Sequence, residues 1–504
     1  MTTFPPALFP DVQLRQNFNQ SLDRDISDGK LGRARKGQAV NPRLLLSTLL
    51  LAVVSCASPP ASFDRVQSTV AERTGNKVQW SRSGAEDAQI EDAVRSLLRR
   101  ELTGEAAVQI ALLNNRDLQA RFEEIGIAQA DLIQAGLLSN PNFFASFRFP
   151  NRPPSGTNIE YSVAQNFLEL LLIPLRKRIA AQQLAATETR VADEVLQLAA
   201  EVKIAFYTAQ ARQQLLERLQ VISQTNQTAL EFTQRLHDAG NVSDLELANQ
   251  QGSYEQSRLE LSQTELQVRR DRERLNRLLG LWGNSIDWKM GDHLPELPER
   301  EVSLQNLESR AISQRLDLHA QRMQLDLIGQ SLALRTKTRY VPAAIRLGVD
   351  TERETDAQRV TGPTLDLELP IFNQGQGEIA KLTAEYRQAQ RKLEALAINI
   401  RSEVREARDQ LVAARDLTSL IGKRLLPTQQ QALNLTLQQY NYMLKGAYDL
   451  LLAKQNEIAA ERSYIEAWRD YWIARAELER AVGGSLSSSS SSSFSSSKTS
   501  TKTK

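Results

Sequence analysis

Cysteine is almost absent from this chain, because Cys56 is the only one among 504 residues. A single cysteine excludes an internal disulfide framework and any metal cluster held by cysteines. Histidine is nearly as rare, and His237, His293 and His319 are too scattered along the sequence for most catalytic metal sites. No other constellation of residues points to catalysis. We therefore expect a protein that is not an enzyme and that needs no metal and no cofactor.

An excess of charge of either sign is also missing. The chain has 62 Lys and Arg residues against 60 Asp and Glu residues, which gives a net charge of +2. Hydrophobic residues make up 41% and charged residues 24%, as in a folded chain with a polar surface. Because a nucleic-acid partner requires an excess of basic charge, we expect no nucleic acid to bind.

Long apolar runs are missing too, with one exception near the N-terminus. The stretch "LLLSTLLLAVVSCASPP" at 44–60 has an apolar core at 44–54, which follows Arg43. This core has about 11 residues, whereas a helix that crosses a membrane needs about 20. Its length and its basic flank are typical of a secretory signal peptide. Since no later run is long enough, we expect any part of the chain that crosses a membrane to be made of strands.

The signal-like run ends at the single cysteine. The residues "VVSC" at 53–56 resemble a bacterial lipobox, which implies that Cys56 is acylated through its sulfur and becomes the first residue of the mature protein. An ordinary buried cysteine is the alternative, but the Ser-Pro-Pro at 58–60 breaks regular structure at once. Ala57 stands where an aspartate would retain a lipoprotein at the inner membrane. The resemblance therefore implies a lipid-anchored protein of the bacterial outer membrane, with most of its mass in the periplasm.

The two ends of the chain differ from its body. Residues 1–40 are too polar for a signal peptide, and we expect translation to start near Leu31 or Val40. An N-terminal extension and the signal peptide would then cover 1–55, and a linker with an N-terminal periplasmic segment would cover 56–100. The serine-rich stretch at 485–504 has the low complexity that is typical of a disordered tail.

Proline and glycine are missing from the 65 residues between Pro174 and Gly240. One continuous helix of this length would extend roughly 100 Å. Its apolar residues recur every three or four positions, as in the seam of a coiled coil: Val191, Val195, Leu198, Val202, Ala205 and Ala209. The same spacing returns later, at Ala397, Ile400, Val404, Ala407, Leu411 and Ala414. Gly422 and Pro427 interrupt that second helix, and we expect a bend there.

The chain also repeats itself at a period of about 200 residues. The matching segments are 114–143 with 313–344, 237–250 with 443–455, and 275–280 with 478–483. We expect two repeats of one plan, each with a helix, two strands and a long helical hairpin. They would cover 101–284 and 301–484, joined by a linker at 285–300.

Four short stretches change from helical to strand periodicity. Their alternating apolar residues are Phe143, Ala145, Phe147 and Phe149 in the first, Ile345, Leu347 and Val349 in the third, and Leu365, Leu367 and Leu369 in the fourth. The second stretch, 158–167, alternates less clearly, and Phe144 breaks the polar face of the first. Strands of about 9–11 residues with one apolar and one polar face suit an outer membrane.

Four strands cannot close a barrel, and an open sheet edge cannot lie in lipid. The chain must therefore either pair with copies of itself or stay out of the membrane. Three copies would supply twelve strands, a number compatible with a water-filled channel.

These features together resemble the TolC family of outer-membrane efflux factors over roughly residues 100–484. The lipobox and the duplicated plan carry the resemblance, with the segments "QAGLLSNPNF" (134–143), "LPIFNQGQGEIA" (369–380) and "LERAVGG" (478–484). The segments "FNQGQGEIA" and "FLELLLIPLRKRIAAQQ" (167–183) are most similar to the CzcC-like heavy-metal branch of that family.

The resemblance implies a mainly α fold with a small β part. Long antiparallel coiled-coil hairpins would form a trimeric α-barrel, and four strands per chain would contribute to a 12-stranded transmembrane β-barrel. The homotrimer would be a passive duct that docks a periplasmic adaptor, or membrane fusion protein, and an inner-membrane pump of the RND type. Its outer surface would meet outer-membrane lipids, and its cargo would be heavy-metal cations.

Two glycine turns, 239–241 and 445–447, mark the expected hairpin tips. We expect glycine in left-handed geometry at each helix end and Ser243 as a helix cap. In the family this region contacts the adaptor and closes the pore. The corresponding adaptor-contacting residues are Arg235, Leu236, Gly240, Val242, Asp244 and Leu245 in the first tip, and Tyr442, Leu444, Gly446, Tyr448 and Leu450 in the second.

Asp449 occupies a position where family members often carry a gate aspartate. Threefold symmetry would make it a ring of negative charge around the pore. The alternative is a solvated carboxylate in the first turn of a helix, which the helix dipole favours. Leu452, three residues on, is apolar where a second aspartate is sometimes found.

The sequence leaves alternatives to heavy-metal efflux open. The same duct could export organic toxicants or act in type I secretion, because scarce His, Met and Cys neither support nor exclude metal traffic. A coiled-coil lipoprotein that tethers the outer membrane without a pore is the chief rival from another class. Amphipathic strands argue against it, because a tether has no use for them.

Overall fold

A computed structural model of the protein describes residues 63–154, 156–299, 303–342 and 344–486. All of them belong to the second of the two units into which the chain divides, Pro60–Lys504. The predictions for the signal peptide, for lipidation of Cys56 and for the serine-rich tail beyond residue 486 lie outside the described residues.

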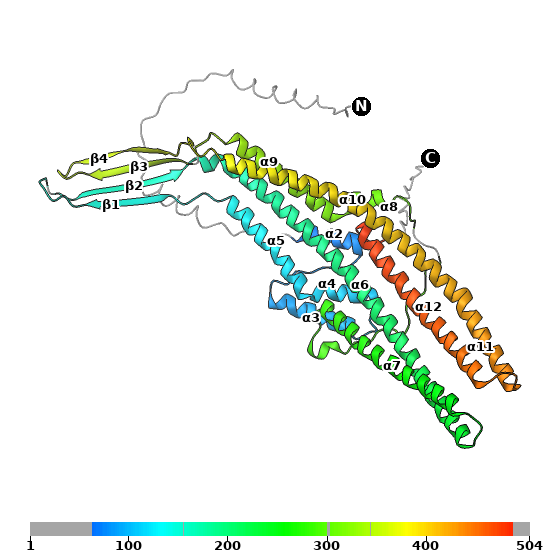
Figure 1. Ribbon diagram of the computed structural model, residues 1–504. Coiled ribbons are helices and arrows are strands. Elements are labelled where there is room, and N and C mark those ends of the chain that lie inside the picture. The colour runs from blue at the N-terminus through cyan, green and yellow to red at the C-terminus, as the bar shows by residue number, and fades with distance from the viewer. Residues whose placement is uncertain (1–62, 155, 300–302, 343, 487–504) are drawn as a thin grey trace, which may run out of the picture. The chain divides into compact units, whose positions relative to one another are not determined.

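The elements follow one plan twice. Before the first repeat lie α2 (Asp64–Thr74) and α3 (Gly84–Leu98). The first repeat contains α4 (Gly104–Asn114), α5 (Arg116–Ala135), β1 (Asn142–Arg148), β2 (Asn158–Asn166), α6 (Leu168–Asp238) and α7 (Asp244–Leu279). After the 3-10 helix η1 (Gly283–Ile286), the second repeat contains α8 (Leu307–Gln314), α9 (Leu316–Lys337), β3 (Ile345–Arg353), β4 (Arg359–Leu367), α10 (Gln376–Leu420), the π-helix η2 (Ile421–Leu425), α11 (Leu426–Asn441) and α12 (Ala447–Val482). Short helices, two strands and a long hairpin thus occur twice in the same order (Figure 1).

Helix α6 confirms the long helix that the sequence predicts. It has 71 residues, which corresponds to about 107 Å at 1.5 Å per residue. Val191, Val195 and Val202 of the predicted seam are fully buried, while Leu198 is half-buried. Burial extends beyond the seam because α4, α5, α9 and α12 pack on α6 as well as α7. The first hairpin is therefore a central support for both repeats.

The second hairpin is interrupted where the sequence predicts. The π-helix η2 separates α10 from α11, and Pro427 lies at the beginning of α11. Gly422 lies in the π turn, where an added Cβ atom would lie 2.5 Å from Cε2 of Tyr464 on α12. Just before the π turn, Thr418 Oγ1 donates a hydrogen bond of 2.9 Å to the carbonyl oxygen of Ala467. The missing side chain at Gly422 thus lets α12 approach the interruption closely.

The strands form one antiparallel sheet in the order β1-β2-β3-β4. All four predicted strands are present. The prediction for β1 was wrong at its end, because β1 stops at Arg148 and Phe149 lies beyond it. The prediction for β4 was also partly wrong. This strand begins at Arg359, before the predicted stretch, and ends before Leu369. Gly362 and Pro363 weaken the strand pattern in the sequence, yet β4 is an edge strand, and edge strands tolerate proline.

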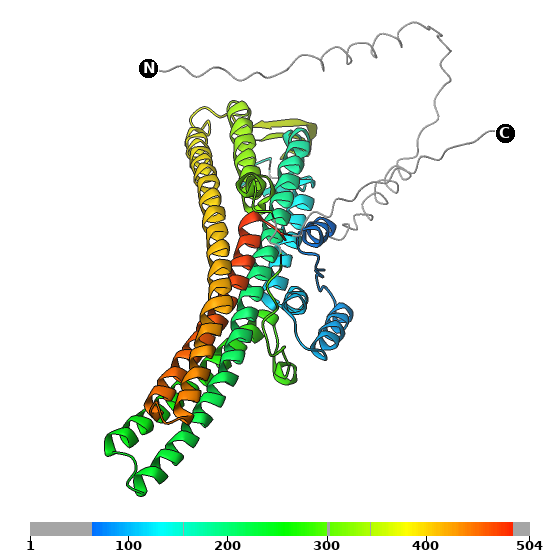
Figure 2. The same cartoon turned by 90° about the vertical axis from the view of Figure 1, so that its right-hand side faces the viewer.

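The long helices lie side by side in a layer (Figures 1 and 2). Helix α7 packs on α6, α6 packs on α12, and α12 packs on α10 and α11, so α7 and α10 lie at the two sides of this layer. One buried cluster includes Phe122 and Phe206 of the first repeat, and another includes Ile400 and Tyr471 of the second. None of the described helices is both long and apolar enough to cross a membrane.

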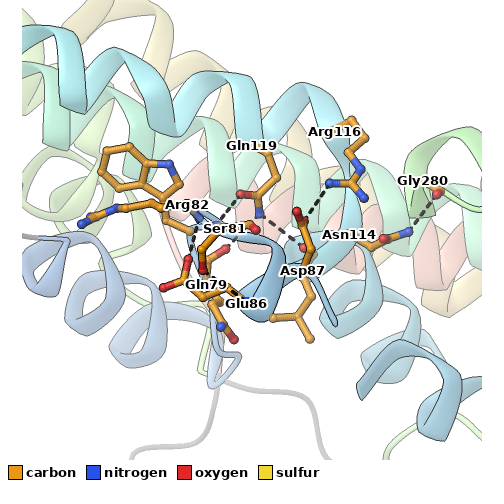
Figure 3. Close-up of polar contacts among 12 residues, drawn as sticks. Gln79, Ser81, Arg82, Glu86, Asp87, Asn114, Arg116, Gln119 and Gly280 are labelled. Atoms are coloured by element: carbon orange, nitrogen blue, oxygen red, sulfur yellow. Dashed lines mark hydrogen bonds and ion pairs between the residues drawn. The ribbon is translucent and has the colours of Figure 1, made fainter. Parts of the chain in front are cut away.

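Side-chain hydrogen bonds and an ion pair join α3 and the residues before it to the first repeat (Figure 3). Gln119 on α5 accepts a hydrogen bond of 2.9 Å from the backbone N–H of Ser81 and donates one of 2.9 Å to the carbonyl oxygen of Gln79. Arg116 pairs with Asp87 at 3.3 Å. These contacts hold α3 and the segment before it against α5.

Candidate functional site

The sheet has one apolar face. Cross-strand partners in the register point to the same side, as Phe143, Val163 and Val349 do. The large apolar side chains on this face are exposed: Phe143, Phe147, Tyr161, Val163, Leu347, Val349, Leu365 and Leu367. Phe143 exposes 68% of its surface and Val349 56%, so no described part of the chain covers this face. A contiguous apolar surface of this kind requires lipid or another protein against it.

The opposite face of the sheet carries charged pairs. Arg148 pairs with Glu160 across β1 and β2 at 2.9 Å, and Arg346 pairs with Asp366 across β3 and β4 at 2.9 Å. Phe144 lies on this face and interrupts it, as the sequence indicates. One apolar and one polar face are what a strand needs between lipid and an aqueous lumen.

Both edges of the sheet are open within the described chain. Strand β1 pairs only with β2, and β4 pairs only with β3. Strand β1 has seven residues and the other three have nine each, close to the length of outer-membrane strands. The unpaired N–H and C=O groups of such edges cannot lie in lipid, so the sheet is incomplete as a membrane structure.

The first predicted tip is the turn between α6 and α7. Gly240 has a φ of +72°, which confirms the left-handed glycine at this helix end. The next residue, Asn241, donates its backbone N–H to the carbonyl oxygen of Leu236 at 2.9 Å. The hydroxyl of Ser243 accepts a hydrogen bond of 3.3 Å from the N–H of Glu246, as the predicted cap of α7. Both sides of this turn are therefore held by hydrogen bonds.

A histidine side chain joins the two helices across the first tip. Nε2 of His237 lies 2.7 Å from Oδ1 of Asp244, which joins the last turn of α6 to the first turn of α7. Nδ1 lies 3.8 Å from Oδ1 of Asp238. The hydrogen bond with Asp244 raises the pKa of His237, and the charges of both carboxylates act in the same direction. This contact could not be predicted from the sequence, because no spacing rule connects positions 237 and 244 across a turn.

The second tip has a matching backbone with different residues. The left-handed residue is Met443, with a φ of +59°. Gly446 has a φ of −83° and is the N-cap of α12, so the prediction of a left-handed glycine there was wrong. In both turns the N-cap follows the left-handed residue by three positions, so Gly446 occupies the place of Ser243 and not that of Gly240. The sequence did not reveal this because glycine is common at both positions.

Asp449 lies in the first turn of α12. Its Oδ2 accepts a hydrogen bond of 3.3 Å from the N–H of Gly446, and its Oδ1 lies 3.4 Å from Nζ of Lys445. The side chain is 42% exposed. These contacts fit a carboxylate favoured by the helix dipole, and its role at a pore stays a prediction. Glu246 holds the equivalent place in the first tip, three residues after the cap.

The other predicted tip residues are mostly exposed. The exposed ones are Arg235, Asp244 and Leu245 in the first tip, and Tyr442, Leu444 and Tyr448 in the second. Leu236, Val242 and Leu450 are half-buried. With Met443, which is 93% exposed and which the sequence analysis missed, the second tip forms an apolar patch of Tyr442, Met443, Leu444 and Tyr448, called here the second-tip patch.

The two tips lie next to each other in the folded structure. A cavity of about 60 Å³ between the hairpins is lined by Thr233 and Asn249 from the first and by Tyr448 and Leu452 from the second. The structure thus brings the predicted tip residues together at one end of α6, and the sheet lies at the other end. In the described part of the chain, no group of three or more His, Cys, Asp or Glu side chains is arranged to hold a metal ion.

The chain matches a protein-family model over part of its length. The model of the family described as "Outer membrane efflux protein" matches residues 155–281. This range covers β2 and the whole first hairpin, which consists of α6, the first tip and α7.

The chain is also similar to individual proteins. The cobalt-zinc-cadmium resistance protein CzcC of Cupriavidus metallidurans is 22% identical over 396 residues, which are 76% of this chain and 90% of that protein. The crystal structure of a membrane protein from Pseudomonas aeruginosa has a TM-score of 0.66 at 20% identity, covering 78% of this chain and 92% of that chain. The CmeC outer membrane channel of Campylobacter jejuni has a TM-score of 0.66 at 14% identity, covering 90% of this chain and 94% of that chain. At these identities the solved structures show a shared fold.

Proposed function

We propose that this chain is an outer membrane efflux protein, a channel component and not an enzyme, and that three copies form the passive outer-membrane duct of a tripartite efflux system. The observation that carries the proposal is the sheet, with its exposed apolar face, its charged opposite face and its two open edges. Lipid would cover the first face and water the second.

A homotrimer removes both open edges at once. Strand β1 of one copy would pair with β4 of the next, and three copies would close a 12-stranded barrel. The hairpins would continue this barrel as a barrel of helices on the periplasmic side. Acylation of Cys56 would add a lipid anchor at the same membrane.

The periplasmic end would carry the contacts with the other components. The second-tip patch is exposed and apolar, which suits docking of a periplasmic adaptor. Beyond the adaptor, an inner-membrane pump, for which we propose the RND type, would supply the energy. Asp449 of three copies would form an acidic ring that narrows the resting pore and favours cations.

Heavy-metal cations are the cargo that we propose. The support is the similarity to CzcC, whose name describes cobalt, zinc and cadmium resistance. A wide aqueous duct does not need to bind its cargo, because selection would take place in the pump. Organic toxicants or a type I secretion substrate would pass through the same duct, and comparing efflux of these cargoes in a strain that lacks the gene would distinguish them.

The rival function is a tether without a pore. Planar-bilayer recording of the purified full-length protein separates the two proposals, since a duct produces discrete current steps and a tether produces none. Conductance steps would support the channel. A trimer that inserts but carries no current would contradict it and favour the tether.

A further inference from the structure

One side of α7 carries three exposed arginines. Arg270, Arg274 and Arg277 are spaced four and three residues apart, so they share one face of the helix. All three are exposed, and none takes part in an ion pair among the residues that the structure describes. Leu266, 42% exposed, extends the same face by one turn. We call these four residues the basic stripe, and the face of α7 that carries Leu275 is buried.

One side of α10 carries the opposite charge. Asp409, Val412, Asp416 and Leu420 are spaced three, four and four residues apart, and all are exposed. Asp416 has no ion pair among the described residues, and Asp409 contacts only its neighbour Arg408, at 2.8 Å, with 68% of its side chain exposed. We call these four residues the acidic stripe. Like the basic stripe, it combines charges with exposed apolar side chains.

The two stripes lie at the same height along the helical layer. Thr418 of α10 bonds to Ala467 of α12, and twelve residues further along α12, Glu479 pairs with Lys203 of α6 at 3.0 Å. Helices α6 and α12 are antiparallel. Going back twelve residues along α12, from Glu479 to Ala467, therefore corresponds to going forward twelve residues along α6, from Lys203 to residue 215.

An ion pair between α6 and α7 relates the heights of residues on these two helices in the same way. Three residues before that level on α6, Arg212 pairs with Asp271 of α7 at 3.6 Å. Residue 418 of α10 therefore lies level with residue 268 of α7, to within about one helical turn. On this scale Leu420 is level with Leu266, Asp416 with Arg270 and Asp409 with Arg277.

We infer that the basic stripe of one subunit packs against the acidic stripe of the next subunit. This inference rests on the proposed trimer and names the surface that sets its register. Helices α7 and α10 lie at the two sides of the layer, so a ring of identical subunits brings one against the other. A closed ring has no translation along its axis, so residues at equal height meet when the helices run along that axis. Arg270 and Arg277 then face Asp416 and Asp409, and Leu266 faces Leu420. The fourth pair is Arg274 with Val412.

The test is charge reversal with rescue in the purified full-length protein. The variants are R270E/R277E, D409K/D416K and the combination of all four substitutions. Each double variant places like charges opposite each other, and we expect the concentration at which half of the protein is trimeric to rise by about tenfold or more, measured by native mass spectrometry in detergent. The combined variant restores opposite charges and should return this value to near that of the unmodified protein.

Arg269→Glu is the matched control. Arg269 is exposed, lies on the same helix beside the stripe, and points about 100° away from Arg270, so it should leave the trimer unchanged. Trimers that survive both double variants, or a combined variant that stays dissociated, would overturn the pairing of the stripes and leave the channel intact as a proposal. If the unmodified protein is itself not a trimer, the proposed function fails first.

A cross-link keeps the inference testable should a reversed variant not fold. Cysteines at R270C and D416C should join subunits with a short bis-maleimide, and cysteines at R269C and D416C should not. Cross-linking of the second pair at the rate of the first would contradict the assigned face.

Discussion

The first hairpin runs from the sheet to its tip as one uninterrupted helix, whereas the second is broken by the π-helix η2 before its tip. Away from the tips, α6 buries residues from Ala186 to Ser223 and packs on helices of both repeats, so the first hairpin is a main support of the fold. Next to the tips the two hairpins are alike, because neither residues 224–238 of α6 nor α11 includes a buried residue. A duplicated plan has thus produced one continuous hairpin and one interrupted hairpin.

The two tips differ in the side chains that hold them. The first tip is held by Gly240, the Ser243 cap and the contact between His237 and Asp244. The second places Met443 in left-handed geometry, has no side-chain oxygen at its cap, and exposes the second-tip patch. The two tips therefore share a backbone geometry but differ in their side chains. Those of the first tip hold the turn by hydrogen bonds, and those of the second tip form an exposed apolar patch.

The largest expected effect concerns two helical glycines, one in each hairpin. Gly422→Ala should destabilise the protein by about 1–3 kcal/mol, because the added methyl group overlaps the ring of Tyr464. Gly252→Ala in α7 meets no atom within 4 Å and should stabilise the protein by up to about 1 kcal/mol. Melting temperatures followed by circular dichroism measure both.

A rescue variant sharpens this comparison. Tyr464→Leu removes the ring from the π turn, so combining it with Gly422→Ala should recover part of the lost stability. If Gly422→Ala melts at or above the unmodified protein, close packing at η2 does not explain the glycine, and the two hairpins are more alike than described.

A smaller effect is expected at the left-handed residues of the two tips. Gly240→Ala should destabilise the first tip by about 1–2 kcal/mol, because a Cβ atom is unfavourable at this φ. Met443→Gly should stabilise the second tip by about 1 kcal/mol or less, since glycine relieves the same strain but costs entropy on folding. Hydrogen exchange of the tip amides reports both changes, and equal signs for the two variants would contradict the assigned geometry.

The smallest effect is a pH dependence confined to the first tip. The pKa of His237 is raised in the folded protein by its hydrogen bond with Asp244, so this contact stabilises the tip at pH values below the ordinary histidine pKa of about 6.5. The stabilisation is lost as the pH rises through the raised pKa. Asp244→Asn should lower the pKa of His237, which deuterium exchange at the imidazole ring followed by mass spectrometry measures.

Asp238→Asn is the matched control for this pH dependence. Asp238 lies 3.8 Å from the ring and contributes less, so its variant should lower the pKa of His237 by a smaller amount. The second tip has no histidine and should show no such dependence. An equal change in both variants would mean that the contact at 2.7 Å is not the main cause.

The sequence predicted much of the fold because the decisive patterns are local. Seam residues such as Val191 and Ile400 are buried as their spacing indicates, and the alternation around Phe143 and Leu347 lies in strands. The break at Gly422 was visible because glycine and proline punctuate a helix. These elements are specified by residues that are close together in the chain.

The tips could be predicted in part only. Gly240 was assigned correctly, but Gly446 was assigned to the wrong place in its turn, because a glycine alone does not distinguish the end of one helix from the start of the next. The contact between His237 and Asp244 depends on how the turn brings two helix ends together. The exposure of Met443 likewise follows from the turn and not from its neighbours in sequence.

The most direct test of the whole account is single-channel recording of the unmodified protein beside Asp449→Ala and Glu246→Ala. The two substituted residues hold equivalent places in the two tips, three residues after the cap. We predict a small cation-selective conductance for the unmodified channel, a larger and less selective one for Asp449→Ala, and no change for Glu246→Ala. No current from any of the three, with trimers intact, or an equal rise in both variants, would contradict a duct that is closed at the second tip.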